Sequence, residues 1–127
     1  MDYNEALRYL YSFANYERVM PKVYSPTSFS LEKAEALMAL LDHPERQFRS
    51  VHVAGTKGKG STARMIQGIL VAAGQRVGLY TQPHLHTHRE RIRINDQLIS
   101  PAELAGIVND FPDLVARYTA AYPHLPP

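Results

Sequence analysis

The sequence contains no cysteine, and this absence excludes several kinds of protein. Without cysteine, neither a disulfide framework nor a thiolate metal site can form. No apolar run reaches the ~18 residues that are needed to span a membrane. The N-terminus also lacks the basic start and the apolar stretch of a secretory signal peptide. We therefore expect a cytoplasmic protein that does not insert into a membrane.

An excess of charge of one sign is also missing. The formal net charge is +2, which is too small to indicate nucleic-acid binding. The acidic residues are dispersed, and neither a pair of catalytic carboxylates nor a Ser-His-Asp set stands out. No internal repeat or low-complexity segment is present. With 127 residues, 45% of them hydrophobic, the chain can bury one core and is one domain or part of one.

The first part of the chain predicts two helices. Apolar residues near helical spacing indicate a helix over about the first fifteen residues. A stretch with two prolines, residues 20–27, follows it. Ser30 is the expected N-cap of a second helix, which His43 and the proline after it end. We treat residues 1–46 as a helical leader. The buried face expected for the second helix consists of Leu31, Ala34, Leu37, Met38 and Leu41.

The next segment predicts a strand, a glycine-rich turn, a helix and a second strand. The first strand lies within residues 47–54 and the second within residues 76–81. The helix between them, residues 62–73, ends at Gly74, which can adopt positive φ. Such a unit has the size of one right-handed parallel crossover. The buried side expected for its helix consists of Met65, Ile66, Ile69 and Leu70.

The last part of the chain predicts a polar loop, a hairpin and helical structure. Ile92 and Ile94 alternate with arginines as in a half-buried strand, and Leu98 and Ile99 can pair back after a turn. Ser100 begins a capping box, so we expect a helix from there to about residue 110. A proline at position 112 either kinks this helix or starts a new one capped by an aspartate at position 110. Residues 47–127 therefore form the β-α-β unit, loop, hairpin and helix.

The glycine-rich turn is the most informative stretch of the sequence. Glycine lets the backbone bend tightly and brings its N–H groups close to an anion. A helix N-terminus adds unpaired N–H donors and a partial positive charge. Lys59 can neutralise phosphate oxygens, and the Ser61 hydroxyl can reach a Mg²⁺ ion bound to the same phosphates. The nucleotide-binding residues that this pattern predicts are Gly55, Thr56, Lys57, Gly58, Lys59, Gly60, Ser61 and Thr62.

Several polar residues allow two interpretations. Thr56 and Thr62 either contact the nucleotide or only bond to the local backbone. His84, His86 and His88 alternate as in a metal-binding loop, but no acidic residue lies between them, which favours histidines that act separately. The charged run at residues 89–93 either holds an anionic substrate or forms the solvated face of an edge strand.

Three motifs resemble those of folylpolyglutamate synthases and dihydrofolate synthases, which belong to the Mur ligase superfamily. They are residues 52–62, residues 77–85 and residues 89–94, in the order and spacing of that family. The helical leader is also similar, so the resemblance covers nearly the whole chain. It implies an α/β fold, namely a partial P-loop (Mur ligase-type) three-layer domain. That domain has a short parallel sheet, N-terminal helices and a C-terminal helix.

The resemblance implies an ATP-dependent amide ligase with Mg²⁺. Such enzymes phosphorylate a folate or pteroate carboxylate, and the amine of glutamate then attacks it. Carried over by position, residues 58–62 hold the ATP phosphates, with Ser61 at Mg²⁺. Gln82 stands where relatives carry a serine that binds Mg²⁺, so it is a candidate metal ligand, and Lys57 replaces a frequent asparagine. The substrate-binding residues implied in this way are Thr81, Pro83, His84, Leu85 and Arg89.

Full-length members of that family are about three times longer than this chain. Their metal-binding Glu and their glutamate-binding domain follow the point that matches Pro127. We therefore expect an N-terminal fragment, without catalytic residues of its own and inactive by itself. Folate or dihydropteroate and glutamate are then partners of the full-length enzyme, and the bare sheet edge and apolar faces predict self-association. The alternatives are a fragment of a dihydrofolate synthase or another Mur-type ligase, or a nucleotide-binding or assembly module without ligase activity.

Overall fold

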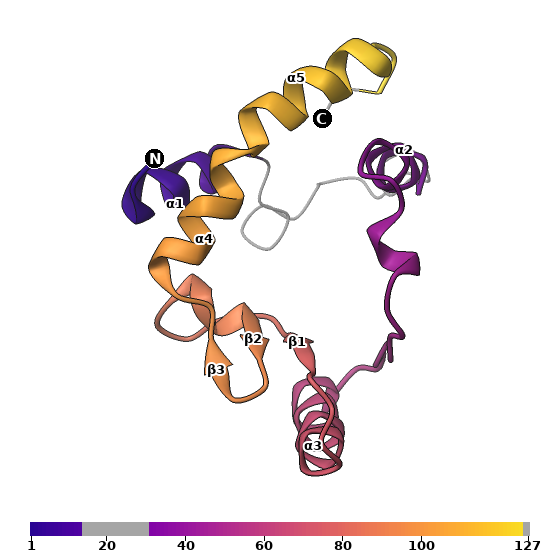
Figure 1. The fold of residues 1–127 in the computed structure, drawn as a ribbon, viewed down its shortest axis with the longest axis vertical. Helices are drawn as coiled ribbons and strands as arrows, with labels where there is room; N and C mark the ends of the chain where they lie inside the picture. Colours follow the sequence, from indigo (N-terminus) through magenta and orange to yellow (C-terminus); the bar gives the residue numbers. More distant parts are fainter. Residues whose placement is uncertain (14–30, 126–127) are drawn as a thin grey trace. The chain divides into compact units, whose positions relative to one another are not determined.

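The computed structural model describes residues 1–13 and 31–125 (Figure 1). The chain divides into two compact units, one formed by Met1–Ser50 with Ala105–Pro127 and the other by Val51–Leu104. Helices and a small sheet are both present, so the α/β class that we predicted is confirmed at this level. Among the described residues, no helix has both the length and the apolar character that a membrane crossing requires.

The first unit begins with α1 (Tyr3–Ser12), which confirms the predicted helix over the described part of its range. Its start is fixed by a reciprocal cap: the Glu5 N–H donates to Asp2 Oδ1 at 2.8 Å, and the Asp2 N–H donates to Glu5 Oε2 at 2.7 Å. The amino group of Met1 also donates to Asn109 Oδ1 at 2.5 Å. Residues 14–15, which we expected to continue this helix, lie outside the described residues.

The second helix, α2 (Glu32–Leu40), is followed by the short 3₁₀ helix η2 (Pro44–Arg46). The buried face that we predicted for α2 is wrong in part: Leu31 is 73% exposed, whereas Ala36 is buried. Helix α5 contacts α2, and the periodicity of α2 alone does not identify the partner against which its apolar residues pack. The predicted cap Ser30 lies outside the described residues.

The C-terminal part forms α4 (Pro101–Asn109) and α5 (Phe111–Ala121). The capping box before α4 is confirmed, since the Glu103 N–H donates to Ser100 Oγ at 3.1 Å and the Ser100 N–H donates to Glu103 Oε2 at 2.8 Å. A new helix starts at Phe111, so the proline after it does not kink α4. Asp110 has an αR backbone and makes no side-chain capping bond, because a capping side chain reaches back best from an extended backbone.

The second unit contains a three-stranded sheet in the order β1-β2-β3. The strands are β1 (Gly78–Tyr80), β2 (Ile92–Ile94) and β3 (Gln97–Leu98), and the 3₁₀ helix η3 (His88–Arg91) leads into β2. Both pairings are antiparallel, with Leu79 opposite Arg93 and Arg93 opposite Leu98. The predicted hairpin is confirmed: its turn begins at Asn95, whose φ is 53°.

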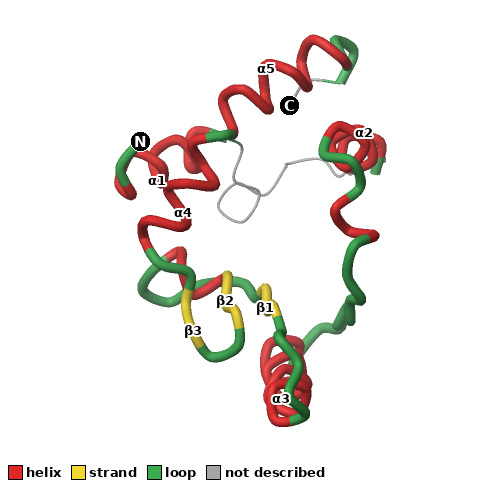
Figure 2. The backbone as a smooth tube through the Cα atoms, in the orientation of Figure 1, coloured by secondary structure: helices red, strands yellow, loops and turns green. Residues whose placement is uncertain are grey.

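The predicted parallel sheet is wrong. Residues 51–54 form no strand, and Figure 2 shows the run from residue 47 to Gly58 as loop. Val51, which lies within the range expected for this strand, is 66% exposed. A strand needs a partner for its backbone N–H and C=O groups, and β1 instead pairs antiparallel with β2. The local β-like composition of residues 51–54 was therefore not enough to form a parallel ladder.

Helix α3 (Lys59–Ala72) contacts β1 and begins three residues earlier than we predicted. Its predicted buried side is also wrong, since Met65 is 62% and Ile69 69% exposed, while Gln67 is buried. The predicted end is confirmed: Gly74 has φ 81°, and its N–H donates to the Val71 carbonyl at 2.9 Å. The Gln75 N–H donates to the Leu70 carbonyl at 3.0 Å, which completes a Schellman motif.

Candidate functional site: the glycine turn and the loop after β1

The glycine-rich turn has the backbone that its sequence predicts. Gly55 has φ 153° and Gly58 has φ 76°, both in the region that favours glycine. Gly58 is the N-cap of α3 and has no side chain with which to cap it. The first bond of the helix ladder runs from the Thr62 N–H to the Gly58 carbonyl at 2.9 Å. The N–H groups of the first turn, those of residues 59–61, therefore have no acceptor within the helix and can bind an anion.

The Lys59 side chain connects the end of the glycine-rich turn to its start at Gly55. Its Nζ donates to the Gly55 carbonyl at 2.8 Å. An ammonium group has three donors, so this bond is compatible with a further contact to a phosphate oxygen. Ser61 and Thr62 lie in the first turn of α3 and are exposed, as are Thr56 and Lys57. The structure thus gathers the eight predicted nucleotide-binding residues around one helix start.

The loop after β1 carries four of the predicted substrate-binding residues and Gln82, the second candidate metal ligand. The Thr81 N–H donates to the Arg91 carbonyl at 3.0 Å, and the peptide bond between Gln82 and Pro83 is cis. Gln82 Oε1, the oxygen considered for Mg²⁺, accepts a hydrogen bond from the Tyr80 hydroxyl at 3.2 Å. Leu85, at the end of this loop, is 84% exposed. These side chains are available to a ligand, and Gln82 already has one protein partner.

His84 is held by an arginine. Arg91 Nε donates to His84 Nδ1 at 2.8 Å. Because a guanidinium only donates, Nδ1 must be the acceptor, and the ring proton of neutral His84 then sits on Nε2. His88 packs near this ring, with 5.4 Å between the ring centroids. No group of three or more metal-binding side chains forms within the part of the chain that the structure describes.

Glu90 fixes the backbone of the same loop, and the sequence prediction gave it no such role. Glu90 Oε2 accepts from the Leu85 N–H at 2.9 Å, and Oε1 accepts from the His86 and Thr87 N–H groups at 2.9 and 2.8 Å. The three bonds, of which the one from Leu85 contributes most to the shift, lower the pKa of Glu90 from 4.5 to about 2. The Thr-x-x-Glu pattern that starts at Thr87 is the capping-box signal that could have revealed this role.

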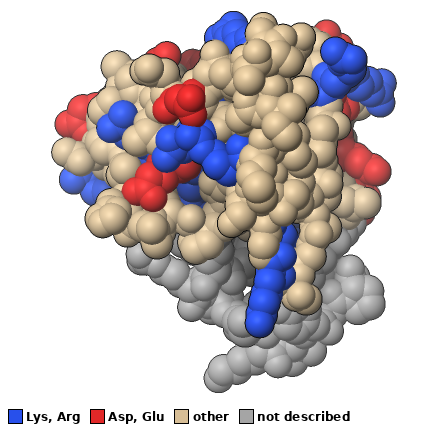
Figure 3. All heavy atoms as spheres, turned by 90° about the horizontal axis from the view of Figure 1, so that it is seen from below, with Lys and Arg blue, Asp and Glu red and all other residues tan. Residues whose placement is uncertain are grey.

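The charged run at residues 89–93 does not form an edge strand. Arg89 and Arg91 lie on η3, and Arg93 lies on β2, the central strand of the sheet. The edge-strand interpretation is therefore wrong. Arg89 Nε donates to the Ile99 carbonyl at 2.5 Å, so part of its guanidinium supports the fold. The face drawn in Figure 3 carries basic and acidic side chains among other residues, in keeping with the formal net charge of +2.

Known proteins similar to this chain are folate ligases. The dihydrofolate synthase/folylpolyglutamate synthase of Mycobacterium tuberculosis is 44% identical over 87 residues, which cover 68% of this chain and 18% of that protein. The solved folylpolyglutamate synthetase from Lactobacillus casei matches with a TM-score of 0.78 and 33% identity, over 94% of this chain and 28% of that chain. A solved complex of folylpolyglutamate synthase with AMPPCP and folate matches with a TM-score of 0.80 and 33% identity, over 95% of this chain and 27% of that one.

No family model matches the chain. The chain spans 18% of the length of the Mycobacterium tuberculosis protein, so the similarity concerns one part of a longer enzyme. The matches to the solved folylpolyglutamate synthases extend over nearly all of this chain, with 33% identity. The chain therefore belongs to the folylpolyglutamate synthase family and corresponds to a fragment of its full-length members.

Proposed function

We propose that this chain is the nucleotide-binding part of an ATP-dependent ligase that adds glutamate to folate. The glycine turn supports this proposal most directly, because it leaves the first-turn N–H groups of α3 without helical acceptors beside Lys59. A solved relative carries AMPPCP, an ATP analogue, together with folate. A dihydrofolate synthase would use the same turn, so this feature does not distinguish the two folate substrates.

The residues present fit a nucleotide phosphate with Mg²⁺. The backbone of the turn offers N–H donors, Lys59 offers positive charge, and Ser61 offers a hydroxyl in the first turn. Gln82 is the second proposed metal ligand, and it would exchange or share its bond from Tyr80. Bound ATP supplies the phosphoryl group that activates the folate carboxylate. The chain itself holds the phosphates and neutralises part of their charge.

The loop after β1 is the proposed folate-facing side of the site. Thr81, Pro83, His84 and Leu85 lie on it, and Arg89 follows within η3. Glu90 holds the backbone of residues 85–87 through three hydrogen bonds, which reduces the number of conformations that the loop must lose on binding. His84 would present its Nε2–H group as a donor, since its Nδ1 accepts from an arginine.

Isothermal titration of the 127-residue chain with Mg-ATP tests this proposal. We expect Lys59→Ala to weaken binding at least about tenfold, because a hydrogen bond to a charged group contributes about 1.5–3 kcal/mol. Lys33→Ala on α2 is the matched control and should bind as the wild type does. Equal affinities of the two variants, or a folded wild type that does not bind Mg-ATP, would contradict the proposal.

We also propose that the isolated chain does not complete the ligase reaction, since it spans 18% of a full-length relative. A phosphate-release assay with ATP, folate and glutamate tests this statement. Lys59→Ala serves as the background, because it removes the proposed phosphate contact. Release by the wild type above this background would show that the fragment is active and would refute this part of the proposal.

A second candidate function is self-association without ligase activity. Met65 and Ile69 are one helical turn apart on α3 and are 62% and 69% exposed, and large exposed apolar surfaces favour association. Light scattering at increasing concentration would detect a dimer. We expect Ile69→Lys to shift the chain toward the monomer, and a wild type that stays monomeric at high micromolar concentration would refute self-association.

A further inference from the structure

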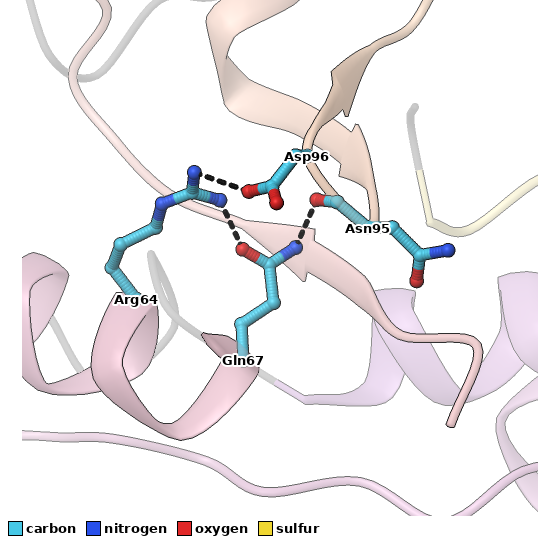
Figure 4. Close-up of polar contacts among 4 residues, drawn as sticks. All are labelled: Arg64, Gln67, Asn95 and Asp96. Carbon is cyan, nitrogen blue, oxygen red and sulfur yellow. Dashed lines mark hydrogen bonds and ion pairs between the residues drawn. The ribbon is translucent and has the colours of Figure 1, made fainter. Parts of the chain in front are cut away.

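A polar bridge joins α3 to the turn between β2 and β3 (Figure 4). It consists of Arg64 and Gln67 on α3 and of Asn95 and Asp96 in the turn, and we call it the α3-turn bridge. Gln67 Nε2 donates to the Asn95 carbonyl at 2.5 Å, and Gln67 Oε1 accepts from Arg64 Nη1. Arg64 Nη2 also donates to Asp96 Oδ1 at 2.6 Å. The bridge therefore connects residues about thirty positions apart.

Gln67 is the centre of the bridge. Its side chain is 2% exposed, so its amide group is buried. Burying an amide costs free energy unless both its oxygen and its nitrogen find partners. In Gln67 both the amide oxygen and the amide nitrogen have a hydrogen-bond partner. A directional contact therefore occupies a buried position where apolar side chains usually pack. An apolar contact tolerates small rotations of a helix, whereas the directional hydrogen bond from Gln67 to the Asn95 carbonyl restricts them.

The turn side of the bridge is itself held in place. Asn95 Oδ1 accepts from the Val77 N–H at 2.9 Å, and the Asn95 N–H donates to the Val77 carbonyl at 2.7 Å. Val77 directly precedes β1, so the carbonyl that Gln67 contacts belongs to the sheet framework. Arg64 and Asp96 are 45% and 74% exposed, and their ion pair adds an outer contact that salt weakens.

The bridge lies on the same helix as the proposed phosphate site. Gln67 follows residues 59–61 by six to eight positions, which is about 9–12 Å along the helix axis at 1.5 Å per residue. A rotation or tilt of α3 would therefore move the N–H groups and side chains of its first turn relative to the loop after β1. A directional contact two turns along the helix restricts that rotation.

We propose that Gln67 is a positioning residue, supported by Arg64. It fixes the orientation of α3 against the sheet, and with it the position of the N–H groups of residues 59–61 relative to the loop after β1. This inference rests on the proposed nucleotide-binding function. It adds to that function a structural requirement outside the glycine turn, carried by side chains that do not touch the nucleotide.

Two measurements on Gln67→Met test the proposal, because methionine keeps the length of the side chain and removes both hydrogen bonds. The first is the dissociation constant for Mg-ATP, and the second is the set of amide resonances of residues 59–61 in the ligand-free chain. We expect at least about fivefold weaker binding and shifted first-turn resonances, with helical circular dichroism retained. Gln75→Met, at an exposed glutamine beyond the end of α3, is the matched control and should change neither.

The two readouts separate this inference from the function on which it rests. If the wild type does not bind Mg-ATP but Gln67→Met shifts the first-turn resonances, the nucleotide-binding proposal fails and the positioning role stands. If Gln67→Met folds, leaves these resonances unchanged and binds Mg-ATP as tightly as the wild type, the positioning role is overturned. If Gln67→Met does not fold, Arg64→Met takes its place, since it removes only the partly exposed half of the bridge. Unchanged resonances in that variant would then overturn the inference.

Discussion

Replacing Gly58 by alanine tests the backbone of the proposed phosphate turn. Gly58 has φ 76° and ψ −1°, and a Cβ atom built there would meet nothing within 4 Å. No steric clash with neighbouring atoms therefore adds to the cost. The cost that remains is that of holding a non-glycine residue in a left-handed conformation, about 1–2 kcal/mol. We expect Gly58→Ala to lower the free energy of unfolding by that amount.

Gly60 provides a matched control two residues away. It lies in the first turn of α3, it has no positive φ, and a Cβ atom there would also meet nothing within 4 Å. Alanine at such a position stabilises a protein by about 0.4–1 kcal/mol, chiefly by restricting the unfolded chain. The two Gly→Ala substitutions should thus differ by about 1.5–3 kcal/mol and have opposite signs. Gly58→Asn should lie closer to the wild type than Gly58→Ala, because asparagine tolerates the left-handed region.

Urea unfolding followed by far-UV circular dichroism measures these differences. With an m-value of about 1–3 kcal/mol/M, the midpoints of the two alanine variants should be separated by about 0.5 M or more. The wild type should unfold between them. If Gly58→Ala is as stable as Gly60→Ala, Gly58 is not left-handed in solution, and the geometry that aims the first-turn N–H groups would be refuted.

Three further predictions concern Glu90, Ser100 and Tyr118. Because hydrogen bonds lower the pKa of Glu90 from 4.5 to about 2, its stabilising contribution is fully present above pH 4.5 and is lost as the pH falls toward 2. Glu90→Gln should therefore lower the melting temperature at neutral pH but not near pH 2, and an equal loss at both would contradict this linkage. Ser100→Ala should lower the urea midpoint through a loss of about 1 kcal/mol, whereas Asp110→Ala, which removes no capping bond, should have less effect. The buried Tyr118 hydroxyl has no hydrogen-bond partner among the described residues, so Tyr118→Phe should keep or raise the melting temperature; a loss above about 1 kcal/mol would indicate a partner.

Features that depend on neighbouring residues were predictable from the sequence. Gly74 ends α3 with positive φ, and the capping box at Ser100 forms as predicted. The hairpin after Ile94 also forms, because its turn and its alternating strand lie within a few residues of one another. In each case the hydrogen-bond partners are close along the chain, so the residue types alone specify the geometry. The family resemblance rested on motifs of the same local kind.

Features that depend on distant partners were predicted less well. The strand expected at residues 51–54 did not form, because β1 pairs with β2 instead. The apolar stripe on α3 predicted that Ile69 is buried, but Ile69 is exposed. Gln67 is buried instead, and it donates a hydrogen bond to the Asn95 carbonyl in the turn after β2. Periodicity and composition describe one segment and do not identify the segment that it contacts.

The sequence by itself determined the glycine turn, the end of α3, the capped start of α4 and the family to which the chain belongs. These properties follow from residue types at fixed short spacings, where the physical choice lies between a few backbone conformations. Only the tertiary structure decided which strands pair and which side of α3 is buried. Those choices depend on contacts such as that of Gln67 with Asn95, between residues that are remote in the chain. The free energy of such a contact depends on which partner satisfies each buried polar group. That partner is determined only when the chain folds.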